Sequence, residues 1–482
     1  MFELYDTLTR KKREIKAGNG KTLRFYCCGP TVYGPAHVGN FRTFLVQDLF
    51  RRVAELSGFK TKHVRNVTDV DDKTIRQSQA EGKSLTAFTQ YWTERFHADC
   101  EKLNLLQPHV EPSAVAHIKE QIEMIEKLIE DKNAYQGKDG SVYFSIRSFK
   151  DYGKLARLDQ QELISGAAQS ANNSDEYTKD AINDFALWKA HRQEDGENYW
   201  DSPWGKGRPG WHLECSAMSL KYLGNDFDLH SGGVDLIFPH HENEIAQSEC
   251  FTGQRFCRHW LHVAHLMVDG GKMSKSLGNL YTVADIEAKG FHPAELRYVL
   301  LSGDYRQPLN FTWDSLHAAW QALGKTQKVV AKLLQIAELQ KLPAYKEQLK
   351  ARVSDLGLFA QAWEALQMDM NAPKALGHFF TALKQVDENL KQGLSSKDAI
   401  LVLSQLAWIL NAIGLEIPER KEAQEQAPEE VKTLAMKRWQ AKQAKDWNTA
   451  DKLRDEIASL GWTIKDRKDG FDLIKNASAA DL

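Results

Sequence analysis

Hydrophobic positions near the start of the chain predict a strand, a loop, a helix and a second strand, in that order. The run 22–28 is rich in apolar residues and stops at a Gly-Pro pair, which is typical of a buried strand that enters a loop. Apolar residues recur at helical spacing over 41–56, and Gly58 follows as a C-terminal cap. The run 62–67 predicts the second strand. This order indicates a parallel βαβ unit, whose sheet binds ligands beyond the carboxyl ends of its strands.

A second unit of the same kind is predicted later in the chain, with a strand at 227–230, a helix over 239–250 and a strand over 260–268. We expect the two units to form the halves of one split sheet. The segment between them, 108–209, shows helical periodicity first and short strands afterwards, which predicts an inserted domain. Its polar stretch 165–180 is expected to be a mobile loop.

The pattern after about residue 313 is helical only. Leu316, Trp320 and Leu323 recur at i, i+4 and i+7, which predicts one buried helix face and, with the helices that follow, an α-helical bundle. Asn371 is predicted to cap a later helix that carries Pro373 in its first turn.

These patterns together predict an α/β protein. The expected architecture is a Rossmann-like parallel-sheet catalytic domain with an inserted domain, followed by an α-helical bundle and a small C-terminal module. The predicted segments are 1–107 and 210–312 for the two halves of the catalytic domain, 108–209 for the inserted domain, 313–418 for the bundle, 419–430 for an acidic linker and 431–482 for the C-terminal module.

Composition supports a folded protein of several domains. The chain has 482 residues, 42% hydrophobic and 27% charged, a balance that excludes a mostly disordered chain. Six cysteines without a Cys-x-x-Cys pair indicate reduced thiols, and residues 1–16 lack the apolar stretch of a secretory signal, so we expect a cytoplasmic protein without a membrane partner. The net charge of −2 suggests no polyanionic partner, but 431–454 holds seven Lys or Arg against two Asp and predicts a local basic face.

The first predicted loop carries candidate phosphate ligands. His37 and Asn40 are three residues apart where the first helix opens, and Gly39 leaves room for a nucleotide. Unpaired N–H groups and the helix dipole favour phosphate at such a position. A Gly-Pro loop with one histidine often only turns the chain, so this motif alone does not establish a phosphate site.

A glycine-hinged loop later in the chain carries two lysines. Lys272 and Lys275 could close over a triphosphate and neutralise the charge that builds on the leaving pyrophosphate. A lysine-rich loop by itself is usually solvated surface, and the pairing with the first loop favours a nucleotide site.

The two loops resemble the hallmarks of class I aminoacyl-tRNA synthetases. Lys272-Met-Ser-Lys275-Ser matches the family loop letter for letter, and His37-Val-Gly-Asn40 stands where the family has His-Ile-Gly-His. Asn40 therefore keeps a neutral donor in place of a histidine. The segments 28–33, 210–218 and 238–244 resemble the cysteinyl-tRNA synthetase family in particular, and the likeness runs over essentially the whole chain.

Four further residues form a candidate metal set. His240 and Glu244 are i and i+4 on a predicted helix, which places them on one face about a turn apart. Cys215 lies near another helix start, and Cys28 ends the first strand. Sulfur, nitrogen and oxygen donors suit zinc. Each residue alone has an ordinary explanation: the cysteines as small buried residues, the histidine as a cap and the glutamate as solvated surface.

A zinc ion would allow the site to distinguish cysteine from serine. A steric pocket separates near-isosteres such as cysteine and serine by about two orders of magnitude at best. Zinc favours a thiolate, and a free thiol has a pKa of about 8.5, whereas a hydroxyl has no comparable tendency to ionise. The resemblance implies that the substrate sulfur joins the four protein ligands, Cys28 included, on one zinc per chain.

The resemblance also implies roles for other residues. Thr68 and Trp211 would line the amino-acid pocket, and Gly29 and Asp235 would contact nucleotide; a strand-end hydroxyl, a core aromatic and a turn aspartate are the ordinary alternatives. Two other sets of residues are weaker candidates for metal sites. The first set is Asp69, Asp71 and Asp72, which we interpret as helix caps or solvated carboxylates. The second set is His259, His262 and His265, which we reject as one metal site because spacing by three alternates the faces of a strand.

The reaction that the resemblance implies has two steps. Cysteine attacks ATP, held with Mg²⁺, to form cysteinyl-adenylate, and the terminal ribose of tRNA then takes the acyl group. His37, Asn40, Lys272 and Lys275 would carry catalysis by positioning and charge stabilisation. The bundle and the C-terminal module, with Trp439 and Trp447 near its lysines, would hold the tRNA of a monomeric enzyme. The alternatives are a cysteine ligase of mycothiol synthesis, which lacks this C-terminal region, and a catalytically silent tRNA-binding paralogue.

Overall fold

The computed structural model describes most of the 482-residue chain. The described residues are 2–158, 184–273, 277–351, 353, 355–418, 427–444, 446–467 and 470–475. Lys275 and the predicted loop 165–180 lie outside them. The chain forms two compact units, Met1–Val283 with Pro293–Ile417 and Ala284–His292 with Pro418–Leu482.

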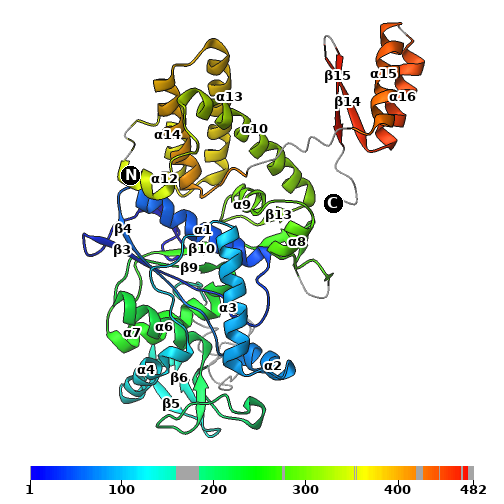
Figure 1. Ribbon diagram of the computed structural model, residues 1–482. Helices are drawn as coiled ribbons and strands as arrows, with labels where there is room; N and C mark the ends of the chain where they lie inside the picture. Colours follow the sequence, from blue (N-terminus) through cyan, green and yellow to red (C-terminus); the bar gives the residue numbers. More distant parts are fainter. Residues whose placement is uncertain are drawn as a thin grey trace. The chain divides into compact units, whose positions relative to one another are not determined.

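A four-stranded parallel sheet in the first unit joins the two predicted halves (Figure 1). Its strand order is β10 (Trp260–Val263), β9 (Leu229–Gly233), β3 (Thr22–Cys27), β4 (Lys60–Arg65), and every pair is parallel. Because β3 from the first half pairs with β9 from the second, the predicted split sheet is confirmed. The carboxyl ends of these strands therefore gather residues from both halves, as ligand sites of such sheets require.

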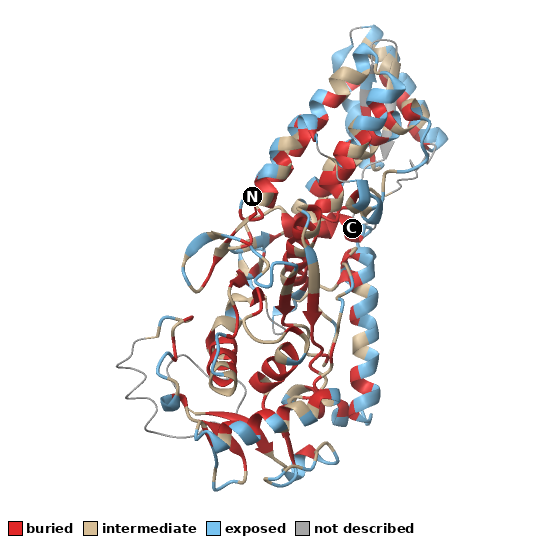
Figure 2. Cartoon of the chain, turned by 90° about the vertical axis from the view of Figure 1, so that its left-hand side faces the viewer, coloured by how far each residue is buried: buried red, intermediate tan, exposed pale blue. Residues whose placement is uncertain are grey.

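Helix α1 (Val38–Leu56) connects β3 to β4. His37 is its N-cap: the His37 side chain accepts from the Asn40 N–H, and the Asn40 side chain accepts from the His37 N–H. The helix ends at Leu56 with Ser57 as its C-cap, and Gly58 follows with a φ of 97° that favours glycine, as predicted. Figure 2 shows the sheet strands as buried, together with the inward faces of the helices around them.

The inserted segment has the predicted order of a helix followed by strands. Helix α4 (Ile118–Glu130) precedes an antiparallel sheet with strand order β5-β6-β7-β8. The strands of this sheet are β5 (Ala134–Gln136), β6 (Val142–Phe144), β7 (Phe185–Ala190) and β8 (Gly207–Pro209), and the helices before it are α2 (Asp72–Ala80) and α3 (Leu85–Lys102).

Two predicted elements of the second half differ from the structure. The strand expected over 260–268 is two strands, because Ala264 donates to the Tyr305 carbonyl and leads the chain out of the main sheet. The second strand, β11 (Leu266–Val268), lies in a separate sheet with β12 (Gly271–Lys272) and β13 (Leu309–Phe311). The strand expected at 227–230 begins only at Leu229.

The helix expected over 239–250 is also divided. An irregular turn η5 (Ile237–His241), with Phe238 in a non-helical conformation, precedes α7 (Glu242–Thr252). Phe238 directly precedes Pro239, and the residue before a proline disfavours the helical conformation, so no regular helix forms across this pair. Helix α6 (Trp211–Leu223) packs beside α7.

The region after 313 in the first unit is helical, as predicted. Asn371 caps α13 (Ala372–Gln392) through its side chain, and a proline occupies the first turn. Trp320 differs from the prediction: it is 48% exposed, because α10 buries Leu316, Ala319 and Leu323 instead. The helices of this region are α10 (Trp313–Ala337), α11 (Tyr345–Ala351), α12 (Ala360–Gln367), α13 and α14 (Ser396–Ala412). Helix α9 (Pro293–Leu301) precedes them, and the N-terminal hairpin of the same unit is β1 (Glu3–Asp6) with β2 (Lys11–Glu14).

The C-terminal module combines two helices with a hairpin. Helices α15 (Glu429–Gln443) and α16 (Trp447–Ser459) pack with the antiparallel pair β14 (Trp462–Arg467) and β15 (Gly470–Lys475) around a small apolar core. The short helix α8 (Val283–Ala288) lies between β12 and α9 in the sequence. Within the described parts of both units, no helix has the length and apolar character to cross a membrane.

Candidate metal centre and active site

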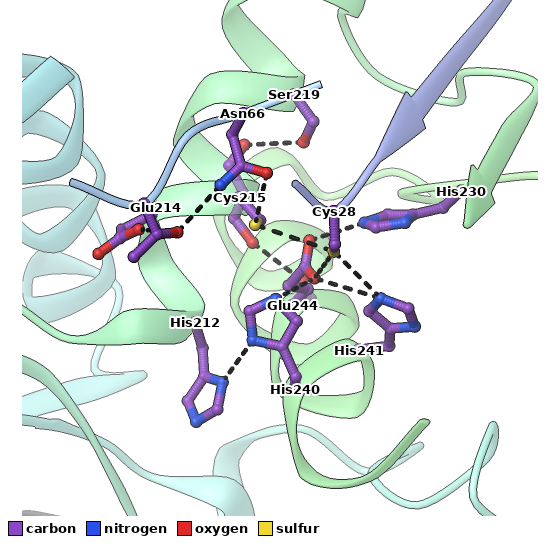
Figure 3. A network of polar contacts seen from close by, with 12 residues as sticks. Cys28, Asn66, His212, Glu214, Cys215, Ser219, His230, His240, His241 and Glu244 are labelled. Carbon is purple, nitrogen blue, oxygen red and sulfur yellow. Dashed lines mark hydrogen bonds and ion pairs between the residues drawn. The ribbon is translucent and has the colours of Figure 1, made fainter. Parts of the chain in front are cut away.

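The four predicted metal ligands meet at the carboxyl ends of the central strands. Cys28 directly follows β3, Cys215 lies on α6, His240 lies in η5 and Glu244 lies in the first turn of α7. The two Sγ atoms are 4.0 Å apart, and Cys28 Sγ is 4.0 Å from Glu244 Oε1. His240 Nε2 lies 3.0 Å from the same oxygen. One donor atom from each residue lies within 4.8 Å of the other three, so one ion could contact all four (Figure 3).

The electrostatics of this cluster favour a bound cation. All four residues are buried, and burial raises the pKa of the Cys28 thiol, as do the neighbouring Cys215 and Glu244. Burial also raises the pKa of Cys215, but the Cys28 hydrogen bond and the His240 charge outweigh it and lower that pKa to about 6. Burial opposes the ionisation of Glu244, yet His230 and His240 hold its pKa below the usual value. Two sulfurs, an imidazole and a carboxylate fit zinc, which neutralises such buried negative charge.

A second set overlaps the first and was missed from the sequence. Cys28, Glu244, His230 and His241 also bring four donor atoms within 4.8 Å of one another. His230 Nε2 lies 2.9 Å from Glu244 Oε2, and His241 Nε2 lies 3.3 Å from Cys28 Sγ. The His-His pair at 240–241 was the only sequence signal for His241, and nothing in the strand pattern singled out His230.

The histidines of strand β10 and its flanks do not form a metal group among the described residues. Their rejection as one site is therefore consistent with the structure. His262 instead supports the cluster, because its Nε2 lies 2.7 Å from His241 Nδ1 while its Nδ1 lies 2.8 Å from Thr7 Oγ1. His259 and His265 lie outside both ligand sets.

Trp211, predicted in the amino-acid pocket, stacks directly on a candidate ligand. Its ring centroid lies 4.3 Å from that of His240, with 28° between the planes. The edge of the His240 ring is held by His212, whose Nδ1 lies 2.9 Å from His240 Nδ1. Two side chains of α6 therefore orient the His240 imidazole toward the cluster.

The predicted phosphate loop has a defined cap geometry. Asn40 N donates to His37 Nδ1 at 3.3 Å, and His37 N donates to Asn40 Oδ1 at 3.1 Å. The cap uses neither His37 Nε2 nor Asn40 Nδ2, so these atoms stay available to a ligand. Burial lowers the pKa of His37, which keeps its imidazole neutral near pH 7.

The two nucleotide motifs lie side by side. A Cβ on Gly39 would stand 3.0 Å from Met273 Sδ of the lysine loop, so glycine allows the two loops to approach. The backbone agrees, because Val38 N donates to the Tyr281 carbonyl at 2.8 Å. Lys272 ends β12 with an exposed side chain.

The other nucleotide candidates flank the strand ends. Gly29 lies against the backbone of Asn66: a Cβ at Gly29 would stand 1.7 Å from the Asn66 carbonyl oxygen. Asp235 is exposed in a short turn, η4 (Val234–Leu236), just after β9. Both positions thus border the carboxyl edge of the sheet, where the resemblance places nucleotide.

The three aspartates after β4 have structural contacts. Asp71 caps α2 and accepts from Thr74 N at 2.7 Å, and Asp69 accepts from Val115 N at 2.9 Å. Asp72 forms ion pairs with Lys189 and Arg208. Asp71 is therefore a helix cap, as interpreted, whereas Asp69 and Asp72 are neither caps nor merely solvated carboxylates, because a backbone N–H and two ion pairs hold them.

Comparison with known proteins decides the family. Residues 14–321 match the family model described as tRNA synthetases class I (C) catalytic domain, and 424–471 match the cysteinyl-tRNA ligase anticodon binding domain. The chain is 52% identical over 477 residues to the cysteine–tRNA ligase of Opitutus terrae, covering 98% of both chains. The chain belongs to the cysteine–tRNA ligase family. It is thus a class I aminoacyl-tRNA synthetase, as the motifs predicted.

Other relatives agree with the cysteine–tRNA ligase family. The cysteine–tRNA ligase of Brachyspira hyodysenteriae is 42% identical, with 97% of this chain and 98% of that protein covered. Among solved structures, Mycobacterium tuberculosis methionyl-tRNA synthetase bound by methionyl-adenylate aligns with a TM-score of 0.55 at 15% identity, covering 82% of this chain and 90% of that one. A leucyl-tRNA synthetase complex from Agrobacterium radiobacter aligns with a TM-score of 0.57 at 10% identity, covering 83% and 85%. At these identities the structures support the fold alone.

Proposed function

We propose that this family member activates L-cysteine with ATP and transfers the cysteinyl group to the 3′ end of its tRNA, with one zinc ion selecting the substrate thiol. The ion would be held by Cys28, Cys215, His240 and Glu244. The observation that carries this proposal is the convergence of these four buried donors, from three segments far apart in the chain, at the carboxyl ends of the central strands. We prefer this set to the one with His230 and His241 because two sulfur donors suit zinc better than one.

The metal would act on the one difference between cysteine and serine. Zinc supplies a Lewis acid that favours a thiolate over a hydroxyl. The chain's own residues would hold the metal ligands in place, because Trp211 stacks on His240. A buried site excludes water, which strengthens electrostatic interactions within it.

The proposed chemistry needs no covalent enzyme intermediate. In the first step a carboxylate oxygen of cysteine attacks the α-phosphorus of ATP, and the bond to pyrophosphate breaks. In the second step a terminal ribose hydroxyl of tRNA attacks the acyl carbon, loses its proton, and AMP leaves. His37 Nε2 and Asn40 Nδ2 would bind phosphate oxygens at the α1 N-terminus, and Lys272 with Lys275 would neutralise the leaving pyrophosphate, which Mg²⁺ accompanies.

The C-terminal region distinguishes this proposal from one of its two rivals. A mycothiol-pathway cysteine ligase lacks that region, whereas this chain matches the anticodon binding domain over 424–471. Trp447 is 57% exposed, which supports base stacking in preference to a core role. We therefore infer tRNA, cysteine and ATP as the partners. A cytoplasmic, monomeric enzyme is what the family resemblance implies.

Pyrophosphate exchange tests the proposal. We expect purified protein to hold about one zinc, and exchange to depend on cysteine but not on serine. Cys215→Ser should lose zinc and exchange while keeping its circular dichroism spectrum. Full cysteine-dependent exchange by metal-free protein would refute the zinc role. Charging of tRNA by the wild type separates it from a silent paralogue.

A further inference from the structure

Asn66 is a buried amide at the end of strand β4 that joins two strand-end loops. It is 1% exposed, and its Oδ1 accepts the Gly29 N–H at 2.9 Å. Because a backbone N–H can only donate, this contact fixes which end of the amide is oxygen. The NH₂ end therefore faces Thr68, where Nδ2 donates to Oγ1 at 3.1 Å.

The Thr68 hydroxyl is held from its other side by Glu214. Thr68 Oγ1 donates to Glu214 Oε2 at 3.0 Å, and both side chains are buried. A hydroxyl has one hydrogen and two lone pairs. Since Glu214 takes the hydrogen and Asn66 occupies one lone pair, the remaining lone pair can only accept.

This acceptor lies beside the candidate metal centre. Cys215 Sγ is 3.8 Å from Asn66 Oδ1, and Glu214 is the neighbour of Cys215 on α6. Figure 3 shows Asn66 and Glu214 on the same side of the cluster. The Thr68 backbone is fixed as well, because its N–H donates to the Pro30 carbonyl at 3.0 Å. A cysteine whose sulfur reached the cluster would carry its α-ammonium group within a few bonds of it.

We propose that Asn66 and Glu214 are positioning residues that lock the Thr68 hydroxyl as a hydrogen-bond acceptor for the α-ammonium group of the substrate. This inference rests on the proposed function. An ammonium group has donors only, so an acceptor-only hydroxyl is complementary to it. A hydroxyl free to rotate would serve a substrate without the ammonium group equally well.

Glu214 can accept the Thr68 hydrogen in either of its protonation states. Burial raises the pKa of Glu214 well above its usual value, and Cys215 adds to the effect. A carboxyl group keeps an accepting oxygen in both of its protonation states. Glutamine keeps the same accepting oxygen, which makes Glu214→Gln the conservative partner of Glu214→Met.

The test compares two thiol ligands on the zinc-loaded full chain by calorimetry. L-Cysteine carries the ammonium group, and 3-mercaptopropionate has the same thiol and carboxylate without it. Asn66→Asp keeps an acceptor for Gly29 but loses the donor to Thr68, and Glu214→Met loses the acceptor. We expect both variants to bind cysteine roughly 10–100-fold more weakly, with 3-mercaptopropionate affinity changed by less than about threefold. Glu214→Gln should recover most of the loss.

Controls separate the possible failures. Ser219→Ala removes a buried hydroxyl of α6 that bonds only to the Ser216 carbonyl in its own helix, and should bind both ligands as the wild type does. Equal weakening of both ligands in Asn66→Asp, or no weakening at all, would overturn the inference. If Asn66→Asp does not fold, the comparison of Glu214→Met with Glu214→Gln decides. A wild type that binds no zinc, or binds serine as tightly as cysteine, would instead refute the proposed function.

Discussion

Asp48 and Arg297 lie 249 positions apart in the chain, and their side chains form a buried ion pair of 2.5 Å. Asp48 stands on α1 of the central βαβ unit. Arg297, on α9, also donates to the carbonyls of Leu103 and Ile413 at 2.8 Å each. Arg52 completes the group with a 2.7 Å contact to the same carboxylate. One carboxylate therefore holds two guanidinium groups that bind the end of α14 to the nucleotide-binding part.

Replacing the Asp48 carboxylate should strongly lower the free energy of unfolding of the first unit. Asp48→Asn leaves two buried guanidinium groups without their counter-charge, a change that typically costs about 3–5 kcal/mol. We expect a lower urea midpoint for Asp48→Asn. Asp387→Asn is the matched control, since Asp387 pairs with Lys332 and Lys391 on the exposed face of the bundle and should change stability by about 1 kcal/mol or less. Similar midpoints for the two variants would contradict the role of burial.

The same pair predicts an acid dependence. Burial raises the pKa of Asp48, but Arg52 and Arg297 outweigh it and lower the pKa to about 2. An unfolded aspartate titrates near a pKa of about 3.9. The ionised group therefore stabilises the fold above about pH 4, and this contribution is lost as the pH falls toward 2. The difference in urea midpoint between wild type and Asp48→Asn should shrink between pH 6 and pH 3; a constant difference would contradict it.

Local patterns in the sequence predicted the main architecture. The four candidate ligands came from these patterns together with the resemblance to cysteinyl-tRNA synthetases, because the spacing of His240 and Glu244 or the strand-end place of Cys28 alone has an ordinary explanation. Asp48 lies within the helical pattern of 41–56, but nothing in that pattern indicates Arg297 as its partner. A partner so far along the chain is fixed by tertiary packing, which no short window of sequence contains.

The features that the sequence did not predict also depend on tertiary packing. His230 and Asn66 matter because of what approaches them in three dimensions, and neither breaks a strand pattern. The predicted strand over 260–268 is two strands because the Ala264 N–H donates to the Tyr305 carbonyl, which lies outside the main sheet. The exposure of Trp320 depends on which neighbour α10 packs against, a choice that helical periodicity leaves open.

The two overlapping ligand sets make opposite predictions. If zinc is bound by the set that contains Cys215, His240→Ala should release the ion on dialysis against a chelator. His241→Ala should keep it, with affinity weakened by roughly 10–100-fold at most, as expected for a supporting residue. Zinc per chain, measured by elemental analysis, checks both. Release from His241→Ala with retention in His240→Ala would favour the other set.

Asn40 allows helix capping to be separated from phosphate binding. Asn40→Asp keeps the oxygen that accepts the His37 N–H, so α1 and thermal stability should be unchanged. It also replaces the Nδ2 donor with a negative charge that repels phosphate, so the KM for ATP in pyrophosphate exchange should rise roughly 10–100-fold. Asn40→His, the residue of the family motif, should keep ATP binding. An unchanged KM for ATP in Asn40→Asp would exclude Asn40 from the phosphate site.

The lysine loop should act on the transition state more than on binding. Because residue 39 is glycine, Met273 can lie against the N-terminus of α1. Lys272 directly precedes Met273 and is therefore close to the predicted phosphate site. Charge on the departing pyrophosphate develops as the bond breaks, so a lysine that meets it should lower the barrier without tightening ground-state ATP. We expect Lys272→Ala and Lys275→Ala each to lower kcat of exchange by about 10²–10³-fold with a small change in the KM for ATP. Lys289→Ala, a lysine outside the loop, is the control. A rise in KM at unchanged kcat would show that the lysines only bind ATP.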